Sequence, residues 1–303
     1  MGHCQVTPQR CWISGLIANL ALGLGLAASS AAAASPPLDL AVSAPAPSRA
    51  ITLAPHITEL MFAAGAGDKI VATVSSSDYP AAALAIQRVG DGVNINIEKT
   101  LTLHPDIVLA WLPSGAARTV APTLAGLNIP LLYSAPKTLD DIAGEIRRMG
   151  ALFHTEAAAS TAARGLQKRI NTLRERYSNR PPVSVFIEVG SAPLYTIGSD
   201  ALLNDALASC GGVNAFANAD IAAPQISIET VLVKQPQVVL VPASGTRSHT
   251  QAVARWKQLG LAAAKADRIY GVDPDALFRP GPRLIDAVER LCPLLEEARS
   301  PRF

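Results

Sequence analysis

The sequence is poor in aromatic residues and in charge, and charge of neither sign is concentrated in one stretch. Aromatic side chains make up 5% of the 303 residues and charged side chains 17%, with a formal net charge of +2. Binding to nucleic acid requires Lys and Arg gathered in a patch or stripe, and the chain has no such cluster. The composition therefore argues against a nucleic-acid partner, and it makes each aromatic residue outside an apolar pattern informative.

The sequence also lacks the short motifs that mark common active sites. It contains no G-x-S-x-G, no H-E-x-x-H and no phosphate-binding loop, and the glycine-rich AGAGDK at 64–69 lacks the third glycine of a dinucleotide fingerprint. Asp273 and Asp275 flank a proline without a partner histidine nearby, which favours a turn or a ligand contact over acid–base catalysis. We expect no enzyme activity, no metal site and no cofactor, and an exported α/β enzyme remains the least favoured alternative.

The first 34 residues have the pattern of a secretory signal. The apolar run WISGLIANLALGLGLAASSAAAAS ends in small residues, which predicts a signal peptide over 1–34 with cleavage after Ala34. A spacer rich in Ala, Ser and Pro follows over 35–48, and no cysteine stands in a lipid-attachment position. These features predict a free exported protein rather than one anchored to the membrane.

Only two of the four cysteines lie beyond the predicted signal. Cys210 and Cys292 form an even pair in a protein expected to enter an oxidising compartment, which favours a disulfide bond between them. Two buried free thiols are the alternative, because cysteine is common in protein cores. Two cysteines without clustered histidines do not form a zinc site.

From residue 49 onward, short apolar segments alternate with segments of helical pattern. Strands that are apolar on both faces and separated by helices are typical of a parallel sheet covered on both sides. The stretch 138–180 differs, because its apolar residues recur at helical spacing until SNRPP ends the pattern, with Gly150 as a candidate point of interruption. The sequence thus predicts an α/β fold of two Rossmann-like lobes with mostly parallel sheets, at 49–137 and 181–303, joined by a long linker helix over 138–180. Strands are expected at 50–54, 69–74, 106–110, 129–134, 183–189, 238–242 and 268–272.

One segment of the first half recurs in the second half. Glu98 aligns with Glu229, 131 residues further on (229 − 98), and the flanking apolar residues match without a gap. The other identical positions are Ile97, Leu101, Pro105, Val108 and Leu109, which meet Ile228, Leu232, Pro236, Val239 and Leu240. Two lobes of one design account for the repeat. Each glutamate begins a short helix, where an acid favours the helix dipole.

Two residues stand where ligands of such folds bind, beyond the carboxyl ends of strands. Trp111 directly follows the strand expected at 106–110, and His56 follows the one at 50–54. The tryptophan faces a cleft between the lobes or else folds onto its own lobe. The imidazole of His56 could bind the cobalt or iron of a chelate, and a hydrogen-bonded loop histidine is the alternative.

A series of longer motifs runs in order from about residue 50 to 298. They are ITLAPHITELMFAAG, SSSDYP, NIEKTLTLHPDIVLAW, VFIEVG, LLNDALASCGGVNAF, APQISIETVL and DALFRPGPRLIDAVERLC. In these motifs the chain resembles the helix-linked, class III family of periplasmic substrate-binding proteins, in its vitamin B12-binding branch. The resemblance implies a rigid linker, modest closure of the lobes, no catalysis, and delivery of a corrinoid to the permease of an ATP-driven importer. We expect the free protein to be monomeric.

The resemblance assigns roles to single residues of this chain. It implies a disulfide between Cys210 and Cys292, and docking of Glu98 and Glu229 on arginines of the permease. Two like charges at equivalent points suit a two-fold symmetric partner, and capping and docking can hold together. The ligand contacts that it implies are Trp111, Tyr195 and the DALFR segment of Asp275, Ala276, Leu277, Phe278 and Arg279.

This sequence departs from the family at three aromatic positions of the pocket. Ser76, Gly92 and Ala223 stand where the family has aromatic rings, and Ser76 remains a candidate ligand contact. Each missing ring removes on the order of 1 kcal/mol beyond its buried area. His56 and Tyr79 are the candidate ligands for a bound metal, and they keep haem or an iron-siderophore as alternative cargo.

Overall fold

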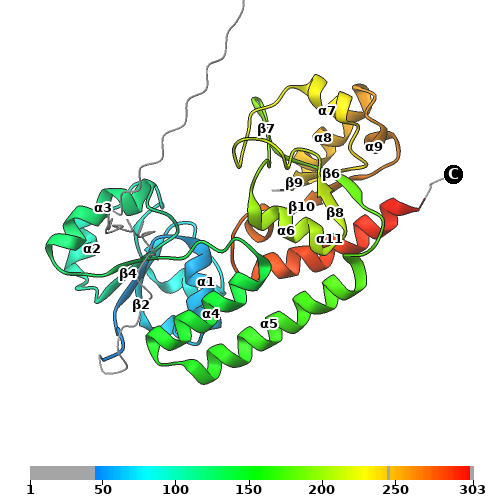
Figure 1. Cartoon of the computed structure of the whole chain (residues 1–303). Helices are drawn as coiled ribbons and strands as arrows, with labels where there is room; N and C mark the ends of the chain where they lie inside the picture. The colour runs from blue at the N-terminus through cyan, green and yellow to red at the C-terminus, as the bar shows by residue number, and fades with distance from the viewer. Residues whose placement is uncertain (1–44, 244–245, 301–303) are drawn as a thin grey trace, which may run out of the picture. The chain divides into compact units, whose positions relative to one another are not determined.

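Residues 45–243 and 246–300 are described by the computed structural model of the chain. The predicted signal peptide and most of the predicted spacer lie outside these ranges. The described strands form two separate sheets, as the sequence pattern predicts (Figure 1), and each sheet has five strands. Within these ranges, no helix has both the length and the apolar character needed to cross a membrane.

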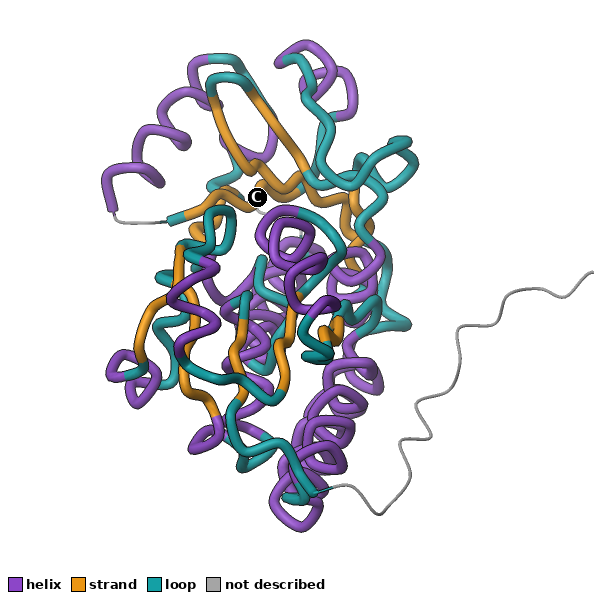
Figure 2. The backbone as a smooth tube through the Cα atoms, turned by 90° about the vertical axis from the view of Figure 1, so that its left-hand side faces the viewer, coloured by secondary structure: helices purple, strands orange, loops and turns teal. Residues whose placement is uncertain are grey.

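The N-terminal lobe is built on a parallel sheet with the order β3-β2-β1-β4-β5. Strands β1 and β4 lie in its middle and are buried along their whole length, because helices cover the sheet (Figure 2). The strands are β1 (Ala50–Thr52), β2 (Ile70–Val74), β3 (Gln87–Gly90), β4 (Ile107–Ala110) and β5 (Leu131–Tyr133), and the α-helices are α1 (Pro55–Ala63), α2 (Ile97–Thr102) and α3 (Gly115–Gly126), with 3-10 turns η1 (Gly67–Lys69) and η2 (Ala81–Ala85).

The C-terminal lobe has a mixed sheet with the order β10-β9-β6-β7, and β8 also pairs with β6. Only β7 runs antiparallel, so the prediction of mostly parallel sheets is confirmed. Its strands are β6 (Val183–Ser191), β7 (Leu194–Thr196), β8 (Gly212–Asn214), β9 (Val238–Pro242) and β10 (Ile269–Val272). Its helices are α6 (Ala201–Ser209), α7 (Ile228–Lys234), α8 (Thr246–Gln258), α9 (Ala262–Lys265), α10 (Pro274–Leu277) and α11 (Arg283–Arg299).

The linker contains a long helix, as predicted, but helix does not run unbroken through 138–180. It consists of α4 (Leu139–Phe153) and α5 (Glu156–Tyr177), which lie side by side (Figure 1). His154 takes the left-handed conformation, with φ 54° and ψ 44°, and this ends α4. Gly150 lets the helices approach closely, since a Cβ there would come within 2.2 Å of the Ala159 Cβ. The 22 residues of α5 span about 33 Å and form the long connection.

One apolar core continues from the first sheet through the linker into the second sheet. It includes Ile57 of α1, Ile146 of α4, Ile170 of α5 and Leu240 of β9. Arg169 of α5 also pairs with two acids of α11, at 2.5 and 2.6 Å. Because close-packed interiors resist deformation, this continuous core favours small movements of one lobe against the other.

The predicted disulfide is present in the C-terminal lobe. Cys210, directly after α6, is bonded to Cys292 in the middle of α11, with an S–S distance of 2.02 Å. Both residues are fully buried. The bond therefore ties the first helix of this lobe to the closing helix of the chain.

Candidate ligand-binding site and docking surface

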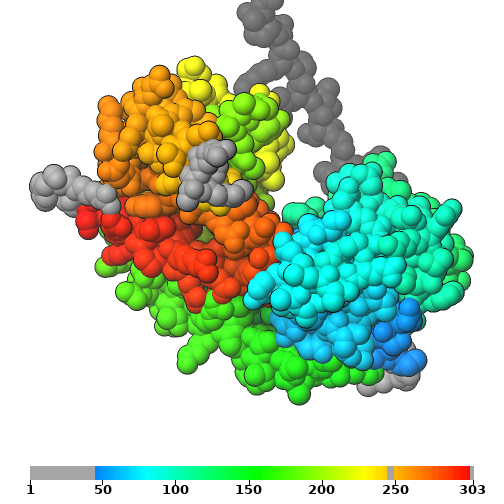
Figure 3. Space-filling view, turned by 180° about the vertical axis from the view of Figure 1, so that it is seen from behind, coloured from blue at the N-terminus to red at the C-terminus, as the bar shows by residue number. Residues whose placement is uncertain are grey.

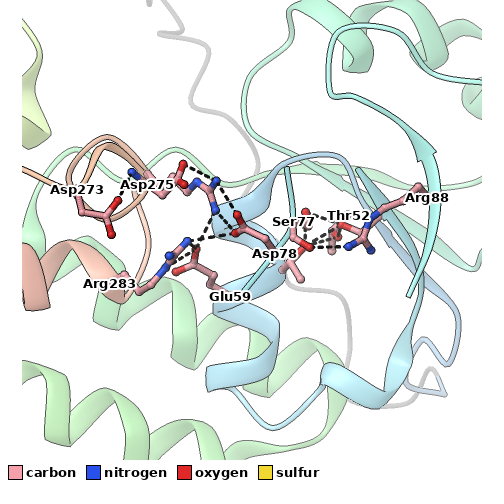
Figure 4. Close-up of polar contacts among 11 residues, drawn as sticks. Thr52, Glu59, Ser77, Asp78, Arg88, Asp273, Asp275 and Arg283 are labelled. Carbon is pink, nitrogen blue, oxygen red and sulfur yellow. Dashed lines mark hydrogen bonds and ion pairs between the residues drawn. The ribbon is translucent and has the colours of Figure 1, made fainter. Parts of the chain in front are cut away.

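An ionic cluster joins the carboxyl edges of the two sheets. The loop after β2 supplies Asp78, and the segment after β10 supplies Asp275 and Arg279 (Figure 4). Arg279 donates from Nη1 to Asp78 Oδ1 at 2.5 Å and from Nη2 to Asp275 Oδ1 at 2.6 Å. The cluster thus connects two residues that are 201 positions apart in the chain.

A second arginine lies below this contact and binds a buried carboxylate. Arg283, the first residue of α11, donates from Nη2 to Glu59 Oε1 of α1 at 2.7 Å. Burial raises the pKa of Glu59, although the hydrogen bond and charge of Arg283 oppose this shift. The Arg283 guanidinium also lies 4.6 Å from the centre of the Tyr79 ring. We call Glu59, Asp78, Asp275, Arg279 and Arg283 the interlobe cluster.

Trp111 and Tyr195 stand at the carboxyl edges away from the interlobe cluster. Trp111 follows β4 and Tyr195 lies on β7, and their side chains are 44% and 37% exposed. Around Trp111, a depression of about 270 Å³ is lined by the ends of β1 and β4 and the first turn of α3. The molecular surface is notched between the two lobes (Figure 3). Exposed rings on both lobes suit a ligand with a broad apolar face.

His56 lies inside the protein beneath Trp111. Its ring is buried and meets the tryptophan edge-on, with centroids 5.3 Å apart, while Nε2 lies 3.2 Å from the Ser134 carbonyl oxygen. Gly281 packs against it so closely that an added Cβ would come within 3.3 Å of the His56 Cβ. Burial lowers the pKa of His56 to about 4. The neutral imidazole therefore supports Trp111, and this placement argues against the predicted contact with a chelated metal.

The buried His56 should make the protein less stable in mild acid. Its pKa is about 4 in the folded protein, so the unfolded chain, at about 6.5, takes up the proton first as the pH falls. Between pH 7 and 4.5 the free energy of unfolding should drop by about 2.5 kcal/mol through this residue. Urea titrations at the two pH values measure the drop. His56→Gln should remove most of it, whereas His154→Gln at an exposed position should not; an undiminished drop in His56→Gln would contradict the assignment.

The DALFR segment divides into a buried and an exposed part. Ala276 and Leu277 are buried and Phe278 is half-buried, so the first two side chains hold the segment in place rather than face a ligand. Asp275 and Arg279 carry its polar groups into the interlobe cluster. Of the predicted ligand contacts in this segment, the structure therefore favours these two.

The remaining predicted pocket positions lie in loops. Ser76 is half-buried and Tyr79 is exposed, both in the loop after β2. Gly92 lines the depression around Trp111 with φ 95°, and Ala223 is exposed in a segment that hydrogen-bonds to β7 and the residues after it. Within 45–243 and 246–300, no group of three acidic, histidine or cysteine side chains is arranged to hold a metal ion.

Sequence reasoning missed Asp78, Glu59 and Arg283. Glu59 and Arg283 lie 224 positions apart, and no spacing rule connects residues at that separation. A signal was present nonetheless, since Glu59 is the only charged residue in the apolar helix pattern ITELMFAAG. A buried charge requires a partner, so this pattern could have prompted a search for a cation.

Glu98 and Glu229 occupy equivalent exposed places on α2 and α7. The side chains of Asn96 and Ser227 cap these helices, accepting from the backbone N–H groups of Lys99 at 2.8 Å and Thr230 at 3.2 Å. The Glu229 backbone N–H and the Ser227 hydroxyl lower the pKa of the Glu229 carboxyl. Asn96 and Ser227 therefore cap the two helices, and the carboxylates of Glu98 and Glu229 remain open to solvent.

Three comparisons place the chain among known proteins. The family model described as periplasmic binding protein matches residues 51–276. The vitamin B12-binding protein of Vibrio cholerae is 39% identical over 254 residues, which cover 83% of this chain and 90% of that protein. The crystal structure of the periplasmic vitamin B12 binding protein BtuF of V. cholerae is 38% identical with a TM-score of 0.76, covering 84% of this chain and 99% of that one. The periplasmic heme-binding protein RhuT of Roseiflexus sp. RS-1 is 26% identical with a TM-score of 0.72, covering 83% and 99%.

Proposed function

This chain belongs to the periplasmic binding protein family, and from that premise we propose that it captures a corrinoid between its lobes and delivers it to an ATP-binding-cassette importer. Vitamin B12 is the expected cargo. The observation that carries the proposal is the pair of exposed aromatic residues, Trp111 and Tyr195, at the carboxyl edges of two sheets that the interlobe cluster joins. The chain is a binding protein rather than an enzyme, as its family and relatives are.

The geometry suits capture of a large, flat ligand. Trp111 and Tyr195 supply apolar surface, and the first-turn backbone of α3 and the polar ends of Asp275 and Arg279 supply hydrogen bonds. His56 holds Trp111 from below, so its ring is in place before the ligand arrives. Preformed walls reduce the ordering cost of binding, which compensates in part for the rings absent at Ser76, Gly92 and Ala223.

The proposal includes the partner and the location of the protein. Glu98 and Glu229 dock on the permease subunits of the importer, one glutamate from each lobe. The protein works in the periplasm. The signal peptide at 1–34 directs its export and is then removed, and the mature protein, which begins with the spacer at 35–48, is not anchored to the membrane. We propose lobes at 49–137 and 181–303 with a linker at 138–180, in a protein that is monomeric when free.

Calorimetric and spectroscopic titration of the purified protein tests the cargo. Cyanocobalamin, dicyanocobinamide, haemin and a ferric siderophore are titrated in parallel. Tight binding of the two corrinoids is the expected result. Tight binding of haemin without binding of either corrinoid would overturn the proposal and favour the alternative cargo.

Replacement of Trp111 tests the position of the site. Trp111→Ala should weaken corrinoid binding by about ten- to a hundredfold, because it removes about 1.5 to 3 kcal/mol of buried apolar contact. Leu127→Ala is the control, since Leu127 is also exposed but follows α3 at the opposite edge of the sheet. The same titrations measure both variants. Equal affinity of the tryptophan variant and the unsubstituted protein would place the site elsewhere.

A further inference from the structure

Arg279 is the best-shielded cation of the interlobe cluster. Its side chain is 12% exposed, whereas the two carboxylates that bind it, Asp78 and Asp275, are 43% and 51% exposed. The carboxylates therefore lie between the guanidinium and solvent. One comes from each lobe, so Arg279 is held between acids on both sides of the joint.

The interlobe cluster contains more carboxyl groups than guanidinium groups. Two guanidinium groups, Arg279 and Arg283, face three carboxyl groups, and Arg283 is 2.7 Å from Glu59 and 3.6 Å from Asp78. Burial disfavours the charged form of Asp78, but the hydrogen bond and charge of Arg279 hold the pKa of this carboxyl below its usual range. Asp78 is thus a carboxylate at neutral pH, and it occupies donors that an anionic ligand would otherwise bind.

We propose that Asp78 is a selectivity residue that keeps Arg279 from binding carboxylate groups on the ligand, so that the site favours chelates whose side chains are neutral amides. The inference rests on the proposed function. The structure supports it because Asp78 already fills the place beside Arg279 that a ligand carboxylate would take. A second carboxylate brought there would meet like charge from Asp78 and Asp275.

This repulsion between like charges does not act on neutral amide groups. A neutral amide can donate from its NH₂ to the exposed oxygens of Asp78 and Asp275 and needs no cation of its own. A carboxylate has only acceptor atoms, so it competes with Asp78 for the same guanidinium hydrogens. The cluster thereby discriminates between two side-chain types of similar size, since it repels one and accepts the other.

Two probes with one ring system test this selectivity. Dicyanocobinamide carries amide side chains, and dicyanocobyrinic acid carries carboxylates on the same corrin ring around the same metal. The unsubstituted protein should prefer the amide form. Asp78→Asn, which keeps the shape and removes the charge, should reduce this preference by about tenfold or more, because a charge-assisted hydrogen bond to Arg279 becomes available to the ligand. Affinity for cobinamide should change much less than affinity for cobyrinic acid, because the asparagine side chain still offers a carbonyl oxygen that accepts from a ligand amide.

Further variants separate selectivity from a structural role. Asp78→Asn combined with Arg279→Gln should restore the preference for the amide form, and Asp275→Asn should lower it as Asp78→Asn does. Asp68→Asn is the matched control, since among the described residues its carboxylate pairs only with Lys69, at the surface. The gain in cobyrinic acid binding should also shrink with added salt.

The outcomes distinguish this inference from the proposed function. An unchanged ratio of the two affinities in Asp78→Asn, with cobinamide still bound, would overturn the role of Asp78 alone. Equal weakening of both ligands would mean that Asp78 only holds the lobes together, and would overturn it too. Failure of the unsubstituted protein to bind cobinamide would instead refute the proposed function, and with it this inference.

Discussion

Substitution of Glu98 and Glu229 together by alanine is expected to abolish uptake while leaving ligand affinity unchanged. Both carboxylates are exposed on the first turns of α2 and α7, at equivalent points of the internal repeat. A charge-assisted hydrogen bond from arginine to carboxylate contributes about 1.5 to 3 kcal/mol, so the loss of two weakens docking by about a hundred- to ten-thousandfold. Neither residue lies at Trp111 or in the interlobe cluster, so binding of the ligand should be unaffected.

Uptake of labelled cobalamin by proteoliposomes that contain the importer measures this effect, and titration measures affinity in parallel. Each single variant should show an intermediate loss, because one lobe can still dock. Asp68→Ala with Glu175→Ala removes the same charge from exposed positions elsewhere and serves as the control. Normal uptake with the double variant at Glu98 and Glu229 would refute the docking role. Stability should change little, since Asn96 and Ser227 still cap the helices.

Among the substitutions proposed for this protein, removal of the disulfide is expected to lower the free energy of unfolding most. The Cys210–Cys292 bond closes a loop with a sequence separation of 82, and in the chain-entropy model such a loop contributes about 4 kcal/mol. Cys210→Ala with Cys292→Ala removes the bond and leaves small apolar side chains in a fully buried place. The unfolding midpoint should fall by roughly 10 °C for a protein of this size.

Urea and thermal unfolding of this double variant give the measurement, with and without reductant. The reduced unsubstituted protein should approach the variant, whereas reductant should not affect the variant itself. Leu202→Ala is a useful comparison, because it truncates a buried side chain of the same helix, α6, and leaves the disulfide intact. A loss below about 1 kcal/mol would mean that the bond restrains the unfolded chain less than the loop length implies.

The order of strands and helices could be predicted from the sequence because local patterns determine it. Apolar runs such as IVLA at β4 and VVLVP at β9 have to be buried on both faces, and this requires helices around them. Strands β3, β7 and β8 were not predicted. They are three or four residues long and partly exposed, so their hydrophobic pattern is too short to detect.

The position of the break in the linker was not predicted, because its cause is not local. The segment around His154 has no proline or glycine at the break, and helical spacing continues on both sides of it. The chain turns there because α5 can pack closely on α4 at Gly150 and Ala159. Tertiary packing outweighed a pattern that was compatible with a continuous helix.

The sequence by itself determined the two-lobe α/β design, the repeated glutamates, the disulfide partners and the position of Trp111 at a strand end. Each of these follows from patterns within a few residues or from a match between segments. Only the tertiary structure decided that His56 is buried and neutral beneath Trp111, and that Arg279 lies between Asp78 and Asp275. Burial and ion pairing depend on which distant segments meet, and electrostatic forces act over distances in space that the order of residues does not encode.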